Sequence, residues 1–101
     1  MSASVVVMRE QNDNLERQID MVIGQIAKLP KGVIVYKQIN GHKYPYRAYR
    51  NEAKVVTVYI KKKEFEEIER KVERRKLLEE RVKNLKREKH AIEVFLEMLE
   101  D

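Results

Sequence analysis

The sequence predicts an α+β protein in which two long amphipathic helices flank a short, basic, tyrosine-rich β-meander. Apolar residues recur at helical spacing in the first and last thirds of the chain, which is typical of helices that bury one stripe. The middle third is rich in β-branched and aromatic residues around an Asn-Gly pair, which is typical of a hairpin. Because 101 residues leave room for one modest core, we expect a single domain over residues 1–101.

The first helix is predicted over residues 5–29. Its apolar residues form a ladder of alternating four- and three-residue steps that is interrupted at Asn12. Ser2 or Ser4 can cap the helix, because a short hydroxyl satisfies the unpaired amides of a first turn. Pro30 ends it, since the proline ring disfavours helical geometry in the preceding residue. The ladder consists of Met8, Leu15, Ile19, Val22, Ile26 and Leu29.

An antiparallel three-stranded meander is predicted over residues 33–61. Asn40-Gly41 separates a strand that begins at Val33 from a return strand over residues 44–50, and both turn residues tolerate the positive φ of a type I′ turn. A two-residue turn sets the register, which predicts the pairs Lys37 with Tyr44, Val35 with Tyr46 and Tyr36 with Pro45.

The second hairpin of the meander is predicted to turn at Asn51-Glu52 and to continue as a strand over residues 55–60. Pro45 has no N–H to donate, so we expect the ladder to this third strand to be interrupted there.

The last helix is predicted over residues 64–99, a stretch without Gly or Pro. Ile68 and Val72 begin an apolar stripe, and a second ladder follows it that is broken only at Lys89. The register shifts near Arg75 between the two. The ladder consists of Leu78, Val82, Leu85, Ile92, Leu96 and Leu99.

The two helices are expected to pair as an antiparallel coiled coil in which the longer last helix overhangs the first by roughly ten residues. The overhang is apolar, and a homo-oligomer, with a dimer as the first expectation, would cover it. Asn12 and Lys89 are polar residues of the type that sets register and copy number. A frayed helix end is the alternative. The predicted oligomerisation residues are Ile92, Phe95, Leu96 and Leu99.

Composition argues against several classes of function. The chain has no cysteine, no basic leader and no apolar run near the ~20 residues of a membrane span, so we expect an intracellular protein without a membrane segment. His42 and His90 lie far apart and lack carboxylates at the spacing of a triad or metal motif. We therefore expect no enzyme activity, cofactor, metal or small-molecule substrate. The high Lys, Glu and Arg content is weakly typical of thermophilic proteins.

Positive charge is concentrated in the middle of the chain. Residues 31–63 carry nine Lys and Arg against one acid, Glu52, for a net +8, whereas the rest of the chain is −3. Cations among aromatic rings favour a nucleic-acid surface, either a sheet that stacks single-stranded bases or a ribbon that enters a major groove of DNA. The predicted interface with DNA or RNA consists of Lys37, Lys43, Tyr44, Tyr46, Arg47, Tyr49, Arg50, Lys54 and Lys61.

Two readings of this segment stay open. For a nucleic-acid surface, the cations at 37, 43, 47, 50, 54 and 61 should share one exposed face. Alternatively, tyrosines fill a small core, lysines protect sheet edges, and the coiled coil is the functional surface of a protein-interaction scaffold that binds no nucleic acid.

Residues 29–63 resemble a group of small uncharacterised prokaryotic proteins. The resemblance rests on Leu-Pro-Lys-Gly at residues 29–32, Tyr-x-x-Tyr-Arg at 46–50 and Val-Tyr-Ile-Lys-Lys at 58–62. In that group a tyrosine-rich meander also precedes a long charged helix. Some members carry a Cys-x-Cys in the hairpin, which this chain lacks. The resemblance implies the architecture and no activity, although such proteins often occur in mobile-element contexts, which favours a nucleic-acid or accessory role.

Overall fold

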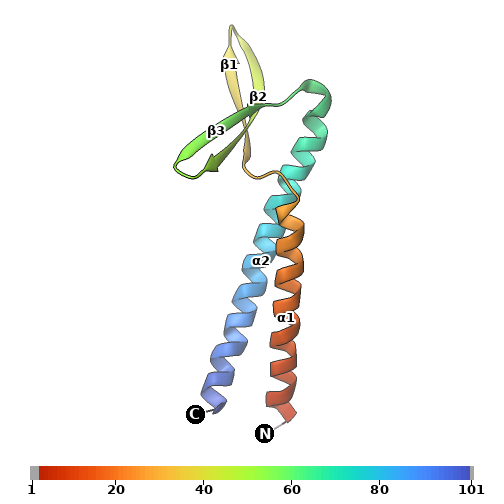
Figure 1. Ribbon diagram of the computed structural model, residues 1–101, viewed down its shortest axis with the longest axis vertical. Helices are drawn as coiled ribbons and strands as arrows, with labels where there is room; N and C mark the ends of the chain where they lie inside the picture. Colours follow the sequence, from red (N-terminus) through yellow and green to blue (C-terminus); the bar gives the residue numbers. More distant parts are fainter. Residues whose placement is uncertain (1–2, 101) are drawn as a thin grey trace. The chain divides into compact units, whose positions relative to one another are not determined.

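The structure is a computed structural model that describes residues 3–100. Its elements follow in the order α1 (Ala3–Ala27), β1 (Val33–Ile39), β2 (His42–Asn51), β3 (Lys54–Tyr59), a short 3-10 turn η1 (Lys62–Glu64) and α2 (Phe65–Glu100) (Figure 1). The predicted α+β class, with a three-stranded antiparallel meander between two helices, is confirmed.

The chain divides into two compact units. The helical unit contains α1 and residues 78–100 of α2, and the sheet unit contains residues 28–77, that is, the meander with the first part of α2. The boundary at Leu78 lies close to Arg75, where the apolar stripe of α2 changes register.

In the helical unit, α1 and the second part of α2 run side by side in opposite directions (Figure 1). Both apolar ladders face the seam, because burial of one stripe is what stabilises an amphipathic helix. The buried side chains are Val5, Leu15, Ile19 and Val22 from α1 and Leu78, Val82, Leu85 and Leu96 from α2. Supercoiling of the pair as a coiled coil stays a prediction.

The bounds of α1 differ slightly from the prediction. The helix ends at Ala27 rather than at residue 29, because Pro30 disfavours helical geometry in the residue that precedes it, Leu29. It begins at Ala3, so Ser4 lies inside the helix and is not its cap. Ser2 lies outside the described residues.

The predicted overhang at the C-terminal end of α2 is wrong. Arg9 of α1 forms an ion pair with Glu100, and Leu96 is only 8% exposed within the single chain. The prediction let α2 pair with α1 from its first residue, whereas residues 65–77 belong to the sheet unit. Leu96, and in part Ile92, are therefore buried inside the helical unit, whereas Phe95 and Leu99 stay about half exposed and remain candidates for self-association.

The first hairpin of the sheet unit has the predicted register, with Lys37 paired to Tyr44, Val35 to Tyr46 and Tyr36 to Pro45. At its turn the φ angles of Asn40 and Gly41 are 50° and 81°, and positive φ at both positions is what a type I′ turn requires.

The second hairpin turns one residue later than predicted. Asn51 pairs with Lys54, so the turn is Glu52-Ala53, and Glu52 takes a φ of 58°. As expected from Pro45, the β2–β3 pairs stop at Tyr46. The Pro45 carbonyl still accepts a hydrogen bond from the Ile60 amide at 3.1 Å, because proline lacks only the donor.

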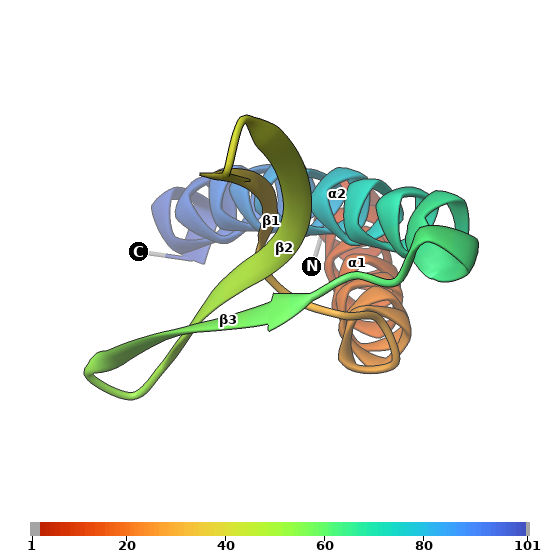
Figure 2. The same cartoon turned by 90° about the horizontal axis from the view of Figure 1, so that it is seen from above.

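The sheet is nearly two hairpins that share one strand. Strand β2 pairs with β1 through residues 42–48 and with β3 through residues 46–51, so three residues are paired on both sides. Figure 2 shows β2 curving as it passes from one partner to the other. With so little sheet paired twice, Ile60 is the one fully buried side chain of residues 28–77, at 1% exposure.

The segment that leads from α1 into β1 is fixed by the rest of the sheet unit. Arg75 donates a hydrogen bond to the Leu29 carbonyl, and Arg47 donates one to the Lys31 carbonyl, both at 2.7 Å. Gly32 has a φ of 106° and lies against the Ala48 carbonyl so closely that a Cβ would collide with its oxygen. Glycine is therefore required at position 32.

Candidate nucleic-acid interface

The predicted interface residues divide between the two faces of the sheet. Directly paired residues of antiparallel strands point to the same side, and neighbours along a strand point to opposite sides. The pairings place Lys37, Tyr44, Tyr46 and Arg50 on one face together with His42 and Tyr59, which we call the aromatic face. They place Lys43, Arg47, Tyr49 and Lys54 on the opposite face. The expectation that the cations of the meander share one exposed face is therefore wrong, and the nine predicted residues do not form a single interface.

A continuous row of rings covers the aromatic face. His42 and Tyr44 have ring centroids 6.4 Å apart, Tyr44 and Tyr59 are also 6.4 Å apart, and Tyr59 meets Tyr46 edge to face at 5.6 Å. Tilted and edge-on pairs are favourable because the positive edge of one ring meets the negative face of the next. Tyr59 is 49% exposed, so the row is open to a ligand.

Lys37 supplies a cation at one end of this row. Its Nζ lies 4.4 Å from the centre of the Tyr46 ring and donates a hydrogen bond to Thr57 Oγ1 at 3.1 Å. The cation–π contact and the hydrogen bond hold the long side chain along the sheet. The aromatic face thus presents a positive charge at a fixed place.

On the opposite face, Arg47 and Tyr49 have a structural role. The Arg47 guanidinium lies 4.5 Å from the centre of the Tyr49 ring, and Lys31 Nζ lies 5.6 Å from the same ring. Since Arg47 also binds the Lys31 carbonyl, this cluster fastens the start of β1 to β2. Both residues are half-buried, whereas Lys43 and Lys54 are exposed.

Lys61 occupies the junction that follows β3. Its carbonyl accepts a hydrogen bond from the Glu64 amide at 2.9 Å, which starts the turn η1, and its side chain is exposed. Arg50, also exposed, pairs with Val55 beside the second turn of the meander.

An open depression of about 940 Å³ forms beside the start of α2, where β2 extends past its last pair with β3. It is lined from both faces of the sheet, because Tyr44 and Tyr59 belong to the aromatic face and Lys43 belongs to the opposite face. It combines flat apolar surface with three lysines and one acid. Ammonium groups around aromatic rings can hold a phosphate beside a stacked base. The lining residues are Tyr36, Lys43, Tyr44, Pro45, Tyr59, Ile60, Lys62, Lys63, Phe65 and Glu66.

The depression brings together two predicted residues, Lys43 and Tyr44, with several that the sequence did not single out. Tyr59 lay outside the predicted interface, and its pairing with Tyr46 places it on the aromatic face. Lys62 and Lys63 follow Lys61 in the sequence, and the chain bends there so that these two, rather than Lys61, line the depression.

Outside the depression, the first turns of α2 carry an ordinary surface ion pair. Lys71 Nζ lies 3.0 Å from Glu67 Oε1, and the hydrogen bond from this ammonium holds the pKa of the Glu67 carboxyl below its usual value. Such exposed pairs four residues apart are typical of solvated helix surfaces.

Two structural properties bear on other classes of function. Across residues 3–100, acidic and histidine side chains nowhere gather in threes at metal-binding distance. In the same part of the chain, neither helix combines the length and apolar content that crossing a membrane requires.

Comparison with known proteins gives a family and no activity. Residues 8–70, more than half of the chain, match a family model described as a domain of unknown function (DUF6788). No curated protein and no solved structure matched the chain.

Proposed function

The chain belongs to the DUF6788 family, whose function is unknown, and we propose that it is a non-enzymatic protein that binds single-stranded nucleic acid through its sheet unit. The observation that carries the proposal is the depression in which Tyr44 and Tyr59 lie beside Lys43, Lys62 and Lys63. A ring row that opens into a lysine-rich hollow suits an unpaired base with its phosphate.

The ring row supports binding of single strands over duplexes. Bases in a duplex are stacked on one another and offer only their edges, whereas an unpaired base offers a flat face to an aromatic side chain. Tyr44 and Tyr59 have such faces at the depression, and a volume of about 940 Å³ accommodates at least one nucleotide.

The lysines support the same function by their charge. Three lysines against Glu66 leave the lining with a formal charge of +2, from 3 − 1. Each cation that neutralises a phosphate of a single strand releases counterions. For each such contact, the logarithm of the binding constant should therefore fall by about 0.7 for every tenfold rise in salt concentration. Lys37 extends the positive surface along the aromatic face.

Titration of a fluorescently labelled single-stranded oligonucleotide with the protein, followed by anisotropy, tests the proposal. We expect binding at about 50 mM salt, with weaker binding to the matched duplex. Tyr59→Leu should weaken binding by about 1–3 kcal/mol, or roughly 5- to 150-fold, whereas Tyr59→Phe keeps the ring and should bind nearly as the native protein does. Lys63→Ala should lower the salt slope by about 0.7.

Lys83→Ala is the matched control, because this lysine is also exposed but lies in the helical unit. It should leave the affinity and the salt slope unchanged. Absence of binding at low salt, or an equal loss from Lys83→Ala and Lys63→Ala, would refute the proposed interface.

A protein-interaction scaffold is the second candidate, because the last turns of α2 expose apolar side chains that the sheet proposal leaves unexplained. Val94, Phe95, Met98 and Leu99 are between 42% and 69% exposed. Under this candidate, Phe95→Glu abolishes partner binding, and charge removal at Lys43 and Lys63 has no effect. The two candidates therefore respond to different variants.

A further inference from the structure

One flank of the helical unit lacks charge on α1, although 39% of the chain is charged. Stepping along α1 by alternating three and four residues from Val7 gives a stripe of uncharged side chains, which we call the glutamine stripe. All six charged residues of the helix lie elsewhere on its surface. The glutamine stripe consists of Val7, Gln11, Asn14, Gln18, Met21 and Gln25.

The corresponding stripe of α2 contains only two charged residues, of opposite sign, and ends in exposed apolar side chains. Phe95 and Met98 are 45% and 69% exposed, and Val7 and Met21 of the glutamine stripe are 59% and 64% exposed. We call this second set the Phe95 stripe. It consists of Arg81, Asn84, Glu88, Ala91, Phe95 and Met98.

Both stripes lie on the same side of the helical unit. Each includes the residue just before a ladder position, as Gln18 precedes Ile19 and Phe95 precedes Leu96. A two-fold axis perpendicular to the plane of an antiparallel helix pair exchanges the two helices. Equivalent positions of the two helices therefore lie on the same side of that plane. The ion pair between Arg9 and Glu100, each one residue after a ladder position, marks the opposite side.

That opposite side of α1 is charged. It carries Arg9, Asp13, Glu16 and Asp20, which suit contact with water, beside one exposed apolar side chain, Ile23. The contrast between the two sides of α1 is the pattern expected when one side faces protein.

We infer that the helical unit forms a homodimer in which the glutamine stripe of each copy packs on the Phe95 stripe of the other. The result is a four-helix bundle with antiparallel neighbours. The contact is isologous, so it closes at two copies. This inference does not depend on nucleic-acid binding by the sheet unit.

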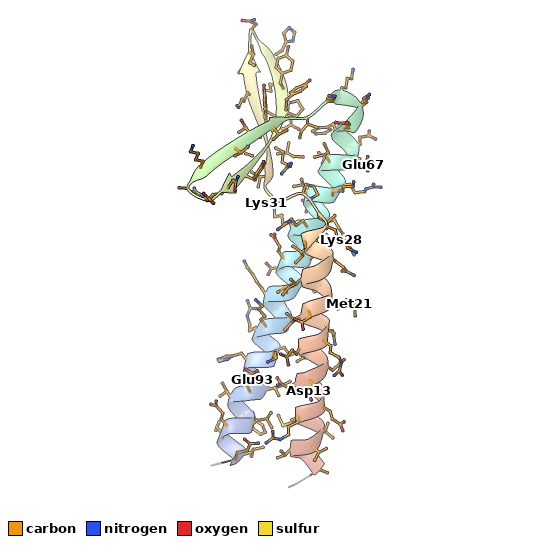
Figure 3. The ribbon with its side chains drawn as sticks, viewed as in Figure 1. Asp13, Met21, Lys28, Lys31, Glu67 and Glu93 are labelled. Carbon is orange, nitrogen blue, oxygen red and sulfur yellow. The ribbon has the colours of Figure 1, made fainter. Side chains whose placement is uncertain are left out.

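Symmetry fixes which residues meet. A two-fold axis parallel to the helices leaves every residue at its own height, so the register within one chain also sets the register between chains. The Asn12 side-chain amide donates a hydrogen bond to the Glu93 carboxyl, and Figure 3 shows Asp13 and Glu93 at a similar height on the two helices. Asn14 therefore faces Ala91 of the second copy, and Val7 faces its Met98.

This register avoids unfavourable charge contacts. Gln18 stands at the height of Glu88, and Gln25 stands at the height of Arg81. A glutamine amide both donates and accepts hydrogen bonds, so it can pair with either charge. The uncharged glutamine stripe of α1 can therefore pack on the Phe95 stripe of a second copy, which carries one positive and one negative residue.

The size of the flank suits a stable dimer. Two helices about 10 Å apart and ~38 Å long present a face of roughly 700–800 Å². Stable interfaces bury about 800 Å² per partner.

Sedimentation velocity of the full chain tests the dimer. We expect a dimer at micromolar concentration, and Met21→Glu should weaken it at least tenfold. Ile23→Glu is the matched control, because Ile23 is 44% exposed on the same helix but lies on the opposite flank, and it should leave the dimer intact. A native chain that stays monomeric at about 100 micromolar, or equal weakening by both variants, overturns the inference.

Cross-linking tests the register, because the chain has no cysteine of its own. We expect a short bis-maleimide to join Asn14→Cys chains to Ala91→Cys chains in a mixture, and neither variant to itself. Both variants should fold, since both positions are exposed on helices. Self-linking of Asn14→Cys would show that α1 packs on α1, which contradicts the proposed arrangement.

Discussion

Replacement of Gly32 by alanine should destabilise the sheet unit severely. The residue has a φ of 106°, and a left-handed backbone costs an alanine about 1–2 kcal/mol. The new methyl group would also collide with the Ala48 carbonyl oxygen and come within 2.9 Å of both the Ala48 carbonyl carbon and Tyr49 Cβ. Overpacking of this kind costs about 1–3 kcal/mol. We therefore expect a loss of roughly 2–5 kcal/mol, a large part of the stability of a small domain.

Tyrosine fluorescence during urea unfolding measures this loss selectively. All five tyrosines lie between residues 36 and 59, and the chain has no tryptophan, so the signal comes from the sheet unit. With a slope near 1 kcal/mol per molar urea, the midpoint should fall by about 2 M or more.

Gly24→Ala is the matched substitution of opposite sign. Gly24 is exposed within α1, and a Cβ there meets nothing within 4 Å. Alanine should therefore stabilise the helical unit by about 1 kcal/mol, as read from the helical signal in circular dichroism.

An unchanged tyrosine midpoint in Gly32→Ala would refute the close approach of Gly32 to β2.

Two further predictions concern single side chains. The hydrogen bond from Lys89 lowers the pKa of the Glu93 carboxyl, and the same bond raises the pKa of Lys89. Because folding lowers the carboxyl pKa, the charged carboxylate stabilises the fold at pH values above the ordinary pKa of glutamate. This stabilisation is lost as pH falls through the lowered pKa, so below about pH 5 the native chain should lose more stability than Glu93→Gln. Urea unfolding between about pH 6 and pH 3 measures the difference, and equal losses would contradict the pair. Glu52→Asn should raise the tyrosine midpoint by an amount equivalent to about 0.5–1 kcal/mol, because asparagine tolerates the positive φ of 58° better than glutamate. Glu52→Ala, which has no side-chain amide to hydrogen-bond the local backbone, should give no such gain.

The features that the sequence predicted correctly depend on local pattern. The apolar ladders specify which side of each helix is buried, since the spacing alone places Leu15 and Ile19 on one stripe. Asn40-Gly41 specifies the first turn because few other residues accept positive φ twice, and the turn then fixes the register of Val35 against Tyr46.

The second turn shows where local pattern fails. Glu52 takes a positive φ that glutamate rarely adopts, so nothing in its side chain identifies it as the first turn residue. A turn at Asn51-Glu52 would pair Tyr59 with Tyr44, whereas the observed turn pairs Tyr59 with Tyr46. The one-residue error therefore shifts the pairing by two residues and leaves Tyr59 on the same face of the sheet.

The sequence by itself determined that two amphipathic helices enclose a basic meander, because periodicity, turn chemistry and charge are properties of neighbouring residues. Only the tertiary structure decided that residues 65–77 belong with the sheet, that Leu96 is covered within its own chain, and that the cations of the meander divide between two faces. Those outcomes depend on which distant segments pack together. Packing depends on the shape and burial of whole surfaces, which residue spacing along the chain does not specify.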